Sequence, residues 1–233
     1  MISEHSISRP GFCEVLAAAG AVALAIAAVP AAARAKDADA ASSKQTPSTL
    51  FTSLGLRDVT VGGEIGRRVD ATVNNNLMKL DVDKDFLQPF RDKTAGSGFV
   101  GVGMLVDAAV GLAAYSNDPQ VVARKQHLVD TLLASQEEDG YIGMMKPDVR
   151  VWALWDVHEM AYIIQGLVRD YRLFGNERSL HAARKVADYI VNRWTAEPDR
   201  KPGGGEITVF MAVTGIEPAM LKLYAETGCP RYL

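Results

Sequence analysis

The sequence predicts an all-α fold, an α/α toroid in which buried inner helices are surrounded by amphipathic outer helices. Three observations support this fold class: segments that are apolar nearly all round, segments with a single apolar face, and a polar turn that recurs after each apolar segment. The two kinds of segment alternate from Val61 onward. The expected architecture is an (α/α)6-barrel, a ring of six helical hairpins, of which this chain is expected to hold about half.

The inner helices are expected in two segments that contain almost no charge. Residues 99–115 have Asp107 as their only charged side chain, and residues 160–168 have none. A helix that is apolar on every side is buried on most sides. The sequence therefore predicts that these two segments lie in the interior of the ring.

The outer helices are expected where apolar residues recur at steps of three and four. One such stripe lies within residues 121–133 and another within residues 180–194, where Arg184, Lys185 and Asp188 occupy the opposite face. This spacing is typical of a helix with one side turned to the core and the other to water.

A short polar turn follows each apolar segment. The turns read Y-S-N-D-P at 115–119, F-G-N-E-R at 174–178 and T-G-C-P-R at 227–231. Their spacing of roughly 55 residues suits a helical hairpin with a long loop, and it fits a tetratricopeptide-type solenoid of about 34 residues per repeat less well. Asn117 or Asp118 is expected to cap the first outer helix, with Pro119 in its first turn, and Asn176 the second.

The first 35 residues are predicted to be a secretory signal peptide. An apolar, alanine-rich run from Val15 to Val29 follows Arg9, and Ala33-Arg34-Ala35 has the pattern of a cleavage site. The run is too short for a comfortable membrane span, so no stable span is expected after cleavage; an uncleaved N-terminal anchor is the alternative. Residues 36–60 are then a linker and lead-in, residues 61–233 belong to the barrel, and the protein is expected to be exported to the periplasm or the cell exterior.

Composition narrows the function classes. The chain has 233 residues, 48% of them hydrophobic, and a net charge of −3, which fits a globular unit with a sizeable core. Basic residues neither dominate nor cluster, so nucleic acid is not an expected partner. Cys13 would leave with the signal peptide, and Cys229 would be the only cysteine of the mature chain, so no internal disulfide is expected. One cysteine and no His-x-x-x-His pattern predict no metal site that this chain completes alone.

The segment W-A-L-W-D-V-H-E-M before the second inner helix combines aromatic, acidic and imidazole side chains. Asp156 followed by Glu159 is predicted to form a capping box, with Trp155 and Met160 as a hydrophobic staple.

Capping leaves two residues of this segment unexplained, Trp152 and His158. The starts of the inner helices of a toroid lie at one open end of the ring, where a concave pocket would form. Tryptophan faces beside carboxylate and imidazole groups are a common way to hold a sugar. Trp152, Trp155, Asp156 and His158 are therefore substrate-binding candidates, and a purely structural cap and core is the alternative.

Three further residues are substrate-binding candidates. Asp139 and Tyr141 lie in a loop expected to lead back to the same end of the ring, although a C-terminal turn at Gly140 would also explain this motif. Glu217 lies within an apolar helix, where a carboxylate needs a partner or a ligand. Asp156 and Glu217 are also candidates for paired acid and base work across the ring.

Four segments carry a resemblance to a known family. They are F-R-D-K-T-A-G at 90–96, Q-E-E-D-G-Y-I-G at 136–143, W-D-V-H-E at 155–159 and I-E-P-A-M-L-K-L-Y-A-E-T-G-C-P-R-Y-L at 216–233. In this order they resemble glycosidases of the beta-L-arabinofuranosidase type, glycoside hydrolase family 127-like. The resemblance covers about Val61 to Leu233, and it implies an (α/α)6-barrel catalytic domain followed by β-sandwich domains.

The resemblance implies a glycoside hydrolase acting on side chains of polysaccharides or glycans, with L-arabinofuranosides among the candidate substrates. Members of the family use a zinc-bound cysteine as nucleophile and a glutamate as acid/base in the later half of the barrel. Cys229 lies where such sequences carry aspartate, so no catalytic residue is assigned to this chain.

The chain is accordingly expected to be an N-terminal fragment that is inactive alone, and zinc is expected only in a longer protein. Tyr162, Gln165 and Val213 stand where relatives often place histidine. A uronate-type barrel with paired carboxylates and a non-catalytic carbohydrate-binding protein are the alternative functions.

Overall fold

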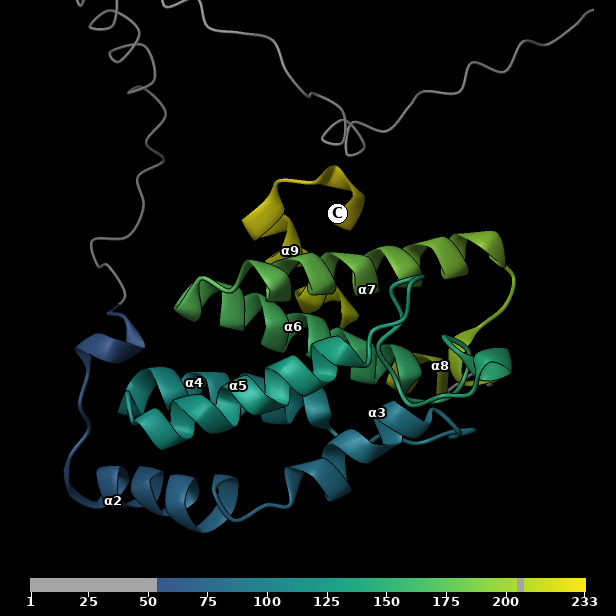
Figure 1. The fold of residues 1–233 in the computed structure, drawn as a ribbon. Helices are drawn as coiled ribbons and strands as arrows, with labels where there is room; N and C mark the ends of the chain where they lie inside the picture. Colours follow the sequence, from purple (N-terminus) through teal and green to yellow (C-terminus); the bar gives the residue numbers. More distant parts are fainter. Residues whose placement is uncertain (1–53, 205–207) are drawn as a thin grey trace, which may run out of the picture. The chain divides into compact units, whose positions relative to one another are not determined.

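The computed structural model describes residues 54–204 and 208–233, which form helices joined by loops (Figure 1). Within this part of the chain there is no β-strand, and Ala95 and Met145 form one isolated bridge. The described residues belong to one compact unit, Leu54–Leu233. The predicted all-α fold is confirmed, while the predicted signal peptide and most of the predicted linker lie outside the described residues.

The helical elements follow one another in a regular order. They are η2 (Leu56–Asp58), α2 (Gly63–Thr72), η3 (Val73–Leu77), η4 (Asp83–Leu87), α3 (Gln88–Asp92), α4 (Val102–Ser116), α5 (Pro119–Ala134), η5 (Pro147–Val149), α6 (Asp156–Phe174), α7 (Glu177–Ala196), η6 (Pro202–Gly204), α8 (Thr208–Ala212), α9 (Ile216–Thr227) and η7 (Pro230–Tyr232).

The helices pack in the alternating arrangement that the sequence predicts. Helix α6 contacts both α4 and α9, and these three are the inner helices. The outer helices α5 and α7 pack against α4 and α6 respectively (Figure 1). The turns after α4, α6 and α9 fall in the three polar motifs recognised in the sequence.

Glycine allows α4 and α6 to approach closely. A Cβ atom at Gly103 would lie 2.3 Å from the backbone nitrogen of Ile163, and one at Gly166 would lie 3.0 Å from a methyl group of Val106. Real side chains do not fit at the first of these distances. The inner helices therefore meet backbone against side chain, which explains why the apolar segments are rich in small residues.

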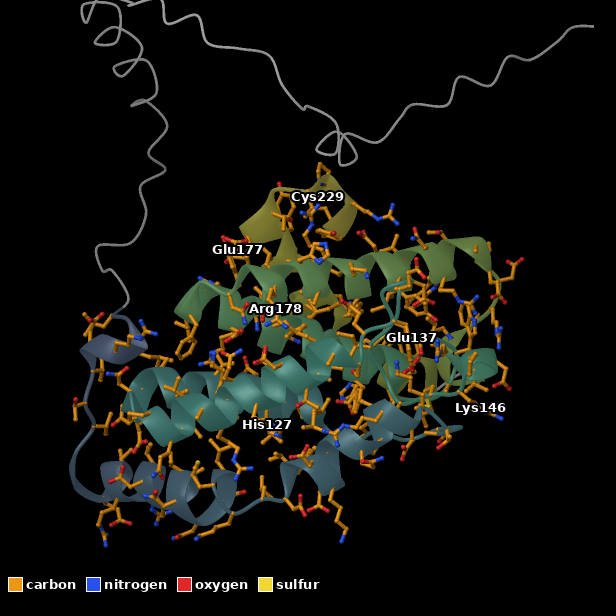
Figure 2. All side chains as sticks on the ribbon, in the orientation of Figure 1. His127, Glu137, Lys146, Glu177, Arg178 and Cys229 are labelled. Carbon is orange, nitrogen blue, oxygen red and sulfur yellow. The ribbon has the colours of Figure 1, made fainter. Side chains whose placement is uncertain are left out.

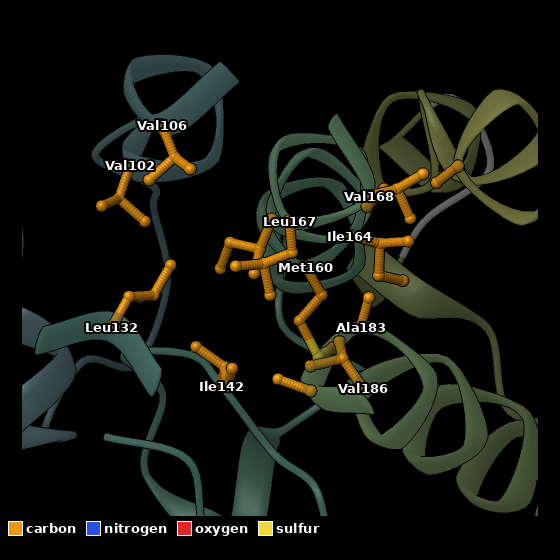
Figure 3. Packing of buried hydrophobic residues seen from close by; sticks show 14 of the residues in the cluster. Val102, Val106, Leu132, Ile142, Met160, Ile164, Leu167, Val168, Ala183 and Val186 are labelled. Carbon is orange, nitrogen blue, oxygen red and sulfur yellow. The ribbon is translucent and has the colours of Figure 1, made fainter. Parts of the chain in front are cut away.

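Apolar side chains from α4, α5, α6, α7 and the loop after α5 fill the space between the layers (Figure 3). Leu132 on α5, Ile142 in the loop, Met160 on α6 and Val186 on α7 are all fully buried. Burying a side chain of this size contributes about 1.5–3 kcal/mol. The apolar stripes of the outer helices thus cover the inner ones, as expected.

Two outer helices begin at the predicted residues. Asp118 precedes α5, and its side chain accepts a hydrogen bond from the Gln120 N–H at 2.7 Å, so the predicted cap is confirmed. Asn176 occupies the equivalent position before α7 but makes no side-chain cap. Its Nδ2 donates instead to Asp170 at 2.8 Å.

Asp170 is the centre of a buried polar network at the end of α6. Lys125 of α5 lies 2.8 Å from one carboxylate oxygen, and Ser179 donates to the other at 2.7 Å. The side chains of Lys125 and Asp170 are only 2% and 0% exposed. Phe174 lies against the lysine, whose Nζ is 3.9 Å from the ring centroid. The sequence analysis did not identify this ion pair.

The first inner helix begins later than the sequence predicts. Helix α4 starts at Val102, because Gly98 and Gly101 adopt left-handed conformations with φ of 94° and 77°. Phe99 therefore lies in a loop and is 41% exposed. None of the described helices combines the length and apolar composition needed to cross a bilayer.

Candidate functional site

Four aromatic side chains meet where α4 and α6 begin. Phe99, Trp155, His158 and Tyr162 form what we call the aromatic cluster. The His158 ring centroid lies 5.2 Å from that of Phe99, 5.2 Å from that of Trp155 and 4.9 Å from that of Tyr162. The Phe99 and Trp155 centroids are 5.4 Å apart. The cluster joins the loop before α4 to the first two turns of α6.

The start of α9 also reaches the aromatic cluster. The His158 Nδ1 lies 3.0 Å from the carbonyl oxygen of Thr214, just before α9. A carbonyl can only accept, so Nδ1 carries the hydrogen, and Nε2 has no hydrogen-bond partner among the described residues. A Cβ atom at Gly215 would lie 3.1 Å from the Tyr162 ring, and φ there is 91°. The starts of three inner helices thus converge at one end, as the sequence predicts.

Glu159 fixes the loop that carries Phe99. Its Oε2 accepts from the N–H groups of Val100 and Gly101, both at 2.9 Å, and its Oε1 accepts from Gly103 at 3.2 Å. These N–H groups lie at the N-terminus of α4, where a helix has no internal partners for them and where negative charge is stabilising. The predicted capping box is therefore wrong: Glu159 caps α4, not its own helix.

Asp156 is likewise not a cap. It is the first residue of α6, after Trp155 with φ of 76°, and it is 1% exposed. Its Oδ1 accepts from the Tyr141 hydroxyl at 2.9 Å and its Oδ2 from the Val151 N–H at 2.7 Å. Val151 has φ of 71°, a strained conformation for a β-branched residue, and Asp156 holds it there. The carboxylate therefore shapes the loop instead of starting the helix.

Burial raises the pKa of Asp156 to about 6, because the charged form loses hydration. The hydrogen bonds from Val151 and Tyr141 oppose this shift, as does the charge of Arg150, and the neighbouring Glu159 adds to it.

Tyr141 supports the same loop from below. Its ring is fully buried, and its hydroxyl donates to Asp156 and accepts from the Met145 N–H at 2.9 Å. Burial raises the pKa of the Tyr141 hydroxyl far above its ordinary value. The expected substrate contact does not fit this burial. Asp139 is exposed and accepts from the Tyr141 N–H at 3.0 Å.

A charged clamp holds the same loop near its ends. Arg150 donates to both carboxylate oxygens of Glu137, at 2.7 and 2.8 Å, and Lys93 donates to one of them at 3.0 Å. The hydrogen bond from Arg150 is the main cause of the lowered pKa of Glu137. Figure 2 shows Glu137 beside this loop. Its bidentate geometry is the strong form of an arginine–carboxylate pair.

Trp152 lies outside the aromatic cluster. It is 6% exposed, the Arg200 guanidinium lies 4.8 Å from the centroid of its ring, and its buried Nε1 has no hydrogen-bond partner among the described residues. Glu217 is exposed in the first turn of α9, so the predicted need for a buried partner does not arise. Asp156 is buried and Glu217 is exposed, which does not fit an acid–base pair in one open site.

Comparison with known proteins identifies the family. Residues 66–233 match the family described as beta-L-arabinofuranosidase, GH127 catalytic domain. The chain belongs to this family. The non-reducing end beta-L-arabinofuranosidase of Bifidobacterium longum subsp. longum is 32% identical to the GH127 chain over 140 residues. The match covers 55% of the chain and 20% of that relative, so the chain spans far less than the length of this protein.

Two solved structures resemble the GH127 chain. A GH127 beta-L-arabinofuranosidase from Geobacillus stearothermophilus T6 aligns with a TM-score of 0.50 and 22% identity, over 71% of this chain and 29% of that one. A GH127 beta-arabinofuranosidase aligns with a TM-score of 0.54 and 18% identity, over 76% of this chain and 32% of that one. These alignments confirm the predicted α/α-barrel, with only part of the barrel covered.

The described part of the GH127 chain does not fit a zinc site. It contains no group of three or more histidine, cysteine, aspartate and glutamate side chains that could hold a metal ion. Cys229 is buried just after α9, and His127 is exposed on α5 (Figure 2). His181 is exposed on α7. We therefore derive no catalytic step through a metal from these residues.

The sequence analysis missed Phe99, Glu159 as a cap of α4, and Tyr162 as a cluster member. The paired glycines around Phe99 were the available signal, because they make a helix start before Val102 unfavourable.

Proposed function

We propose that the protein is a glycoside hydrolase of the beta-L-arabinofuranosidase type and that this chain supplies one wall of its sugar pocket. The aromatic cluster carries the proposal, since it combines exposed ring surface with a free imidazole nitrogen at the converging starts of three inner helices. Ring faces pack against the C–H groups of sugars, and polar groups at their edges bind hydroxyls.

Each residue of the wall has a separate task in this proposal. Phe99 and Trp155 offer ring surface to the sugar, and the His158 Nε2 bonds a hydroxyl. Glu159 positions Phe99 by holding the start of α4, and Asp156 positions Trp155 by shaping the loop before α6. The described residues offer no nucleophile beside a base, so the bond-breaking groups, including any zinc-bound cysteine, are assigned to a longer protein.

The substrate class follows from the family. The name of the Bifidobacterium longum relative specifies a non-reducing end L-arabinofuranoside, and we propose the same class for this protein. A terminal sugar is compatible with a cluster that has exposed ring surface in Phe99. We also propose export, on the basis of the apolar run and the cleavage pattern in residues 1–35.

Sugar binding by the chain itself tests the proposed wall. Trp155→Leu removes ring surface from the aromatic cluster, and Trp194→Leu removes a partly buried tryptophan from α7 as a matched control. Titration with methyl β-L-arabinofuranoside, followed by nuclear magnetic resonance, should show weaker binding by at least about tenfold in the first variant only. Equal affinity in both variants would remove the aromatic cluster from the site.

Hydrolysis tests the activity. The product of the complete native gene should release the chromophore from an aryl β-L-arabinofuranoside. Cleavage of an aryl glucuronide instead would identify the uronate-type barrel, and sugar binding without cleavage of either would identify a non-catalytic binding protein.

A further inference from the structure

Helix α6 has one open stripe below the aromatic cluster. Between Asp156 and Asp170, every residue of α6 is buried except Tyr162 and Arg169. These two are seven positions apart, which places them on the same face of the helix. Arg172 continues this face, and it is exposed.

A cavity of about 170 Å³ lies along this stripe, lined by Asp107 of α4, Gln165, Val168, Arg169 and Arg172 of α6, and Lys222 of α9. None of the four residues of the aromatic cluster lines it. At a rise of about 1.5 Å per residue, Arg169 lies roughly 16 Å along α6 from His158. The cavity is therefore separate from the proposed sugar wall.

Positive charge exceeds negative charge in the wall of the cavity, with three cations and one carboxylate. Asp107 is engaged by Arg169, whose Nη1 lies 2.8 Å from its Oδ2. Lys222 donates to the Gln165 amide oxygen at 2.7 Å and has no carboxylate partner among the described residues. The charge of Lys222 is thus left uncompensated by a direct ion pair.

The two arginines keep unused donors. A guanidinium has five N–H bonds. Arg169 uses Nη1, for the carbonyl and carboxylate of Asp107, and Arg172 uses Nε, which lies 3.0 Å from Glu226. The Nη2 of Arg169 and both Nη groups of Arg172 make no hydrogen bond within residues 54–204 and 208–233. Guanidinium forks match the geometry of oxyanions in a bidentate manner.

We propose that this cavity binds a single oxyanion group, a carboxylate, sulfate or phosphate, at a site distinct from the aromatic cluster. The cavity is large enough for one such group, and its surplus charge and donors favour an anion over a neutral sugar. Asp107 holds the Arg169 guanidinium in place and Gln165 holds Lys222, so two of the three cations are positioned before the ligand arrives. The oxyanion comes either from a free inorganic ion or from an acidic sugar.

Titration of the full chain tests the site. Isothermal calorimetry with sodium phosphate, sodium sulfate and sodium D-glucuronate, at constant ionic strength set with sodium chloride, should show saturable binding of at least one of the three. Binding should weaken as ionic strength rises, because these charges are partly exposed. Saturation by phosphate or sulfate alone assigns a free anion, and saturation by glucuronate assigns the carboxylate of an acidic sugar.

Variants connect the binding to the cavity. Lys222→Gln and Arg172→Gln should each weaken binding at least fivefold, while Lys79→Gln, which changes an exposed lysine outside the cavity, should leave the affinity within twofold. Circular dichroism confirms that each variant is folded. No saturable binding, or equal affinity in all variants, overturns the proposal. Trp155→Leu should leave anion binding unchanged, so failure of the sugar proposal and failure of this one are distinguishable.

Discussion

The two ends of α6 bury carboxylates in opposite ways. At its start, Asp156 and Glu159 accept hydrogen bonds only from backbone N–H groups and a tyrosine hydroxyl. At its end, Asp170 is paired with Lys125, and Asn176 and Ser179 donate to its second oxygen. All three carboxylates are at most 2% exposed.

This difference separates the framework from the proposed site. A buried charge needs a counter-charge or many donors, and removal of its partner is strongly destabilising. The Lys125–Asp170 pair joins α5 to α6 with its charge balanced, whichever ligand is present. The carboxylates at the start of α6 have neutral partners, so their effect depends on geometry and ionisation. The end of α6 is thus fixed, and its start responds to pH and to substitution.

The largest effect is expected from Asp170→Asn, which leaves Lys125 buried with its charge uncompensated. The free energy of unfolding should fall by about 3–5 kcal/mol. Urea denaturation followed by circular dichroism measures this loss. The double variant Lys125→Met with Asp170→Asn should recover much of the stability, because it removes both charges; a single variant as stable as the parent would contradict the framework role.

The pH dependence of stability should reveal Asp156. Its pKa in the folded protein is about 6 and its ordinary value is 3.8, so the folded state binds the proton more tightly. The stabilisation is therefore fully present below about pH 4 and is lost as the pH rises through 6, by about 3 kcal/mol in total.

The matching measurement compares the parent with Asp156→Asn in urea between pH 4 and 7. The difference in unfolding free energy between the two should shrink with rising pH. Glu137 has the opposite sign, because its lowered pKa makes its contribution disappear as the pH falls below its ordinary value of 4.5. A difference that stays constant over this window would show that Asp156 does not titrate there.

Glu159→Gln should have the next largest effect. The substitution keeps the size of the side chain but places an NH2 group against N–H donors of the α4 start, which leaves at least one of them unsatisfied. The expected loss is about 1–3 kcal/mol in the free energy of unfolding. Amide resonances of Gly101 and Gly103 should shift, and contacts between the rings of Phe99 and His158 should weaken in nuclear magnetic resonance spectra. Glu138→Gln, on an exposed residue, is the control and should change neither.

The fold could be predicted from the sequence because its signals are local. Helical spacing within residues 121–133 and the cap at Asp118 depend on neighbours along the chain, and the structure confirms both. The same local reasoning failed at Glu159. A D-x-x-E pattern before an apolar run predicts a capping box, but the donors that Glu159 binds lie 56 to 59 residues earlier in the chain.

The site depended on such long-range partners throughout. Tyr141 was expected at the ligand because of its chemistry, yet its hydroxyl bridges Asp156 and Met145 in the core. Trp155 and His158 were correctly brought together at the start of α6, since both belong to one short segment. Phe99 was assigned to a helix, and only the contact between α4 and α6 shows that it joins them.

The smallest effect on stability is expected from Arg172→Gln, and it completes the comparison along α6. Arg172 lies one turn from the start of the Asp170 network, yet its side chain is 60% exposed and its partner is Glu226 at 3.0 Å. An exposed ion pair contributes at most about 1 kcal/mol, and we expect a loss within about 0.5 kcal/mol in urea denaturation. The same variant should weaken oxyanion binding, so its two readouts separate binding from folding. A loss as large as that of Asp170→Asn would instead make the cationic stripe part of the framework, since buried charges stabilise a helix contact only when they are paired.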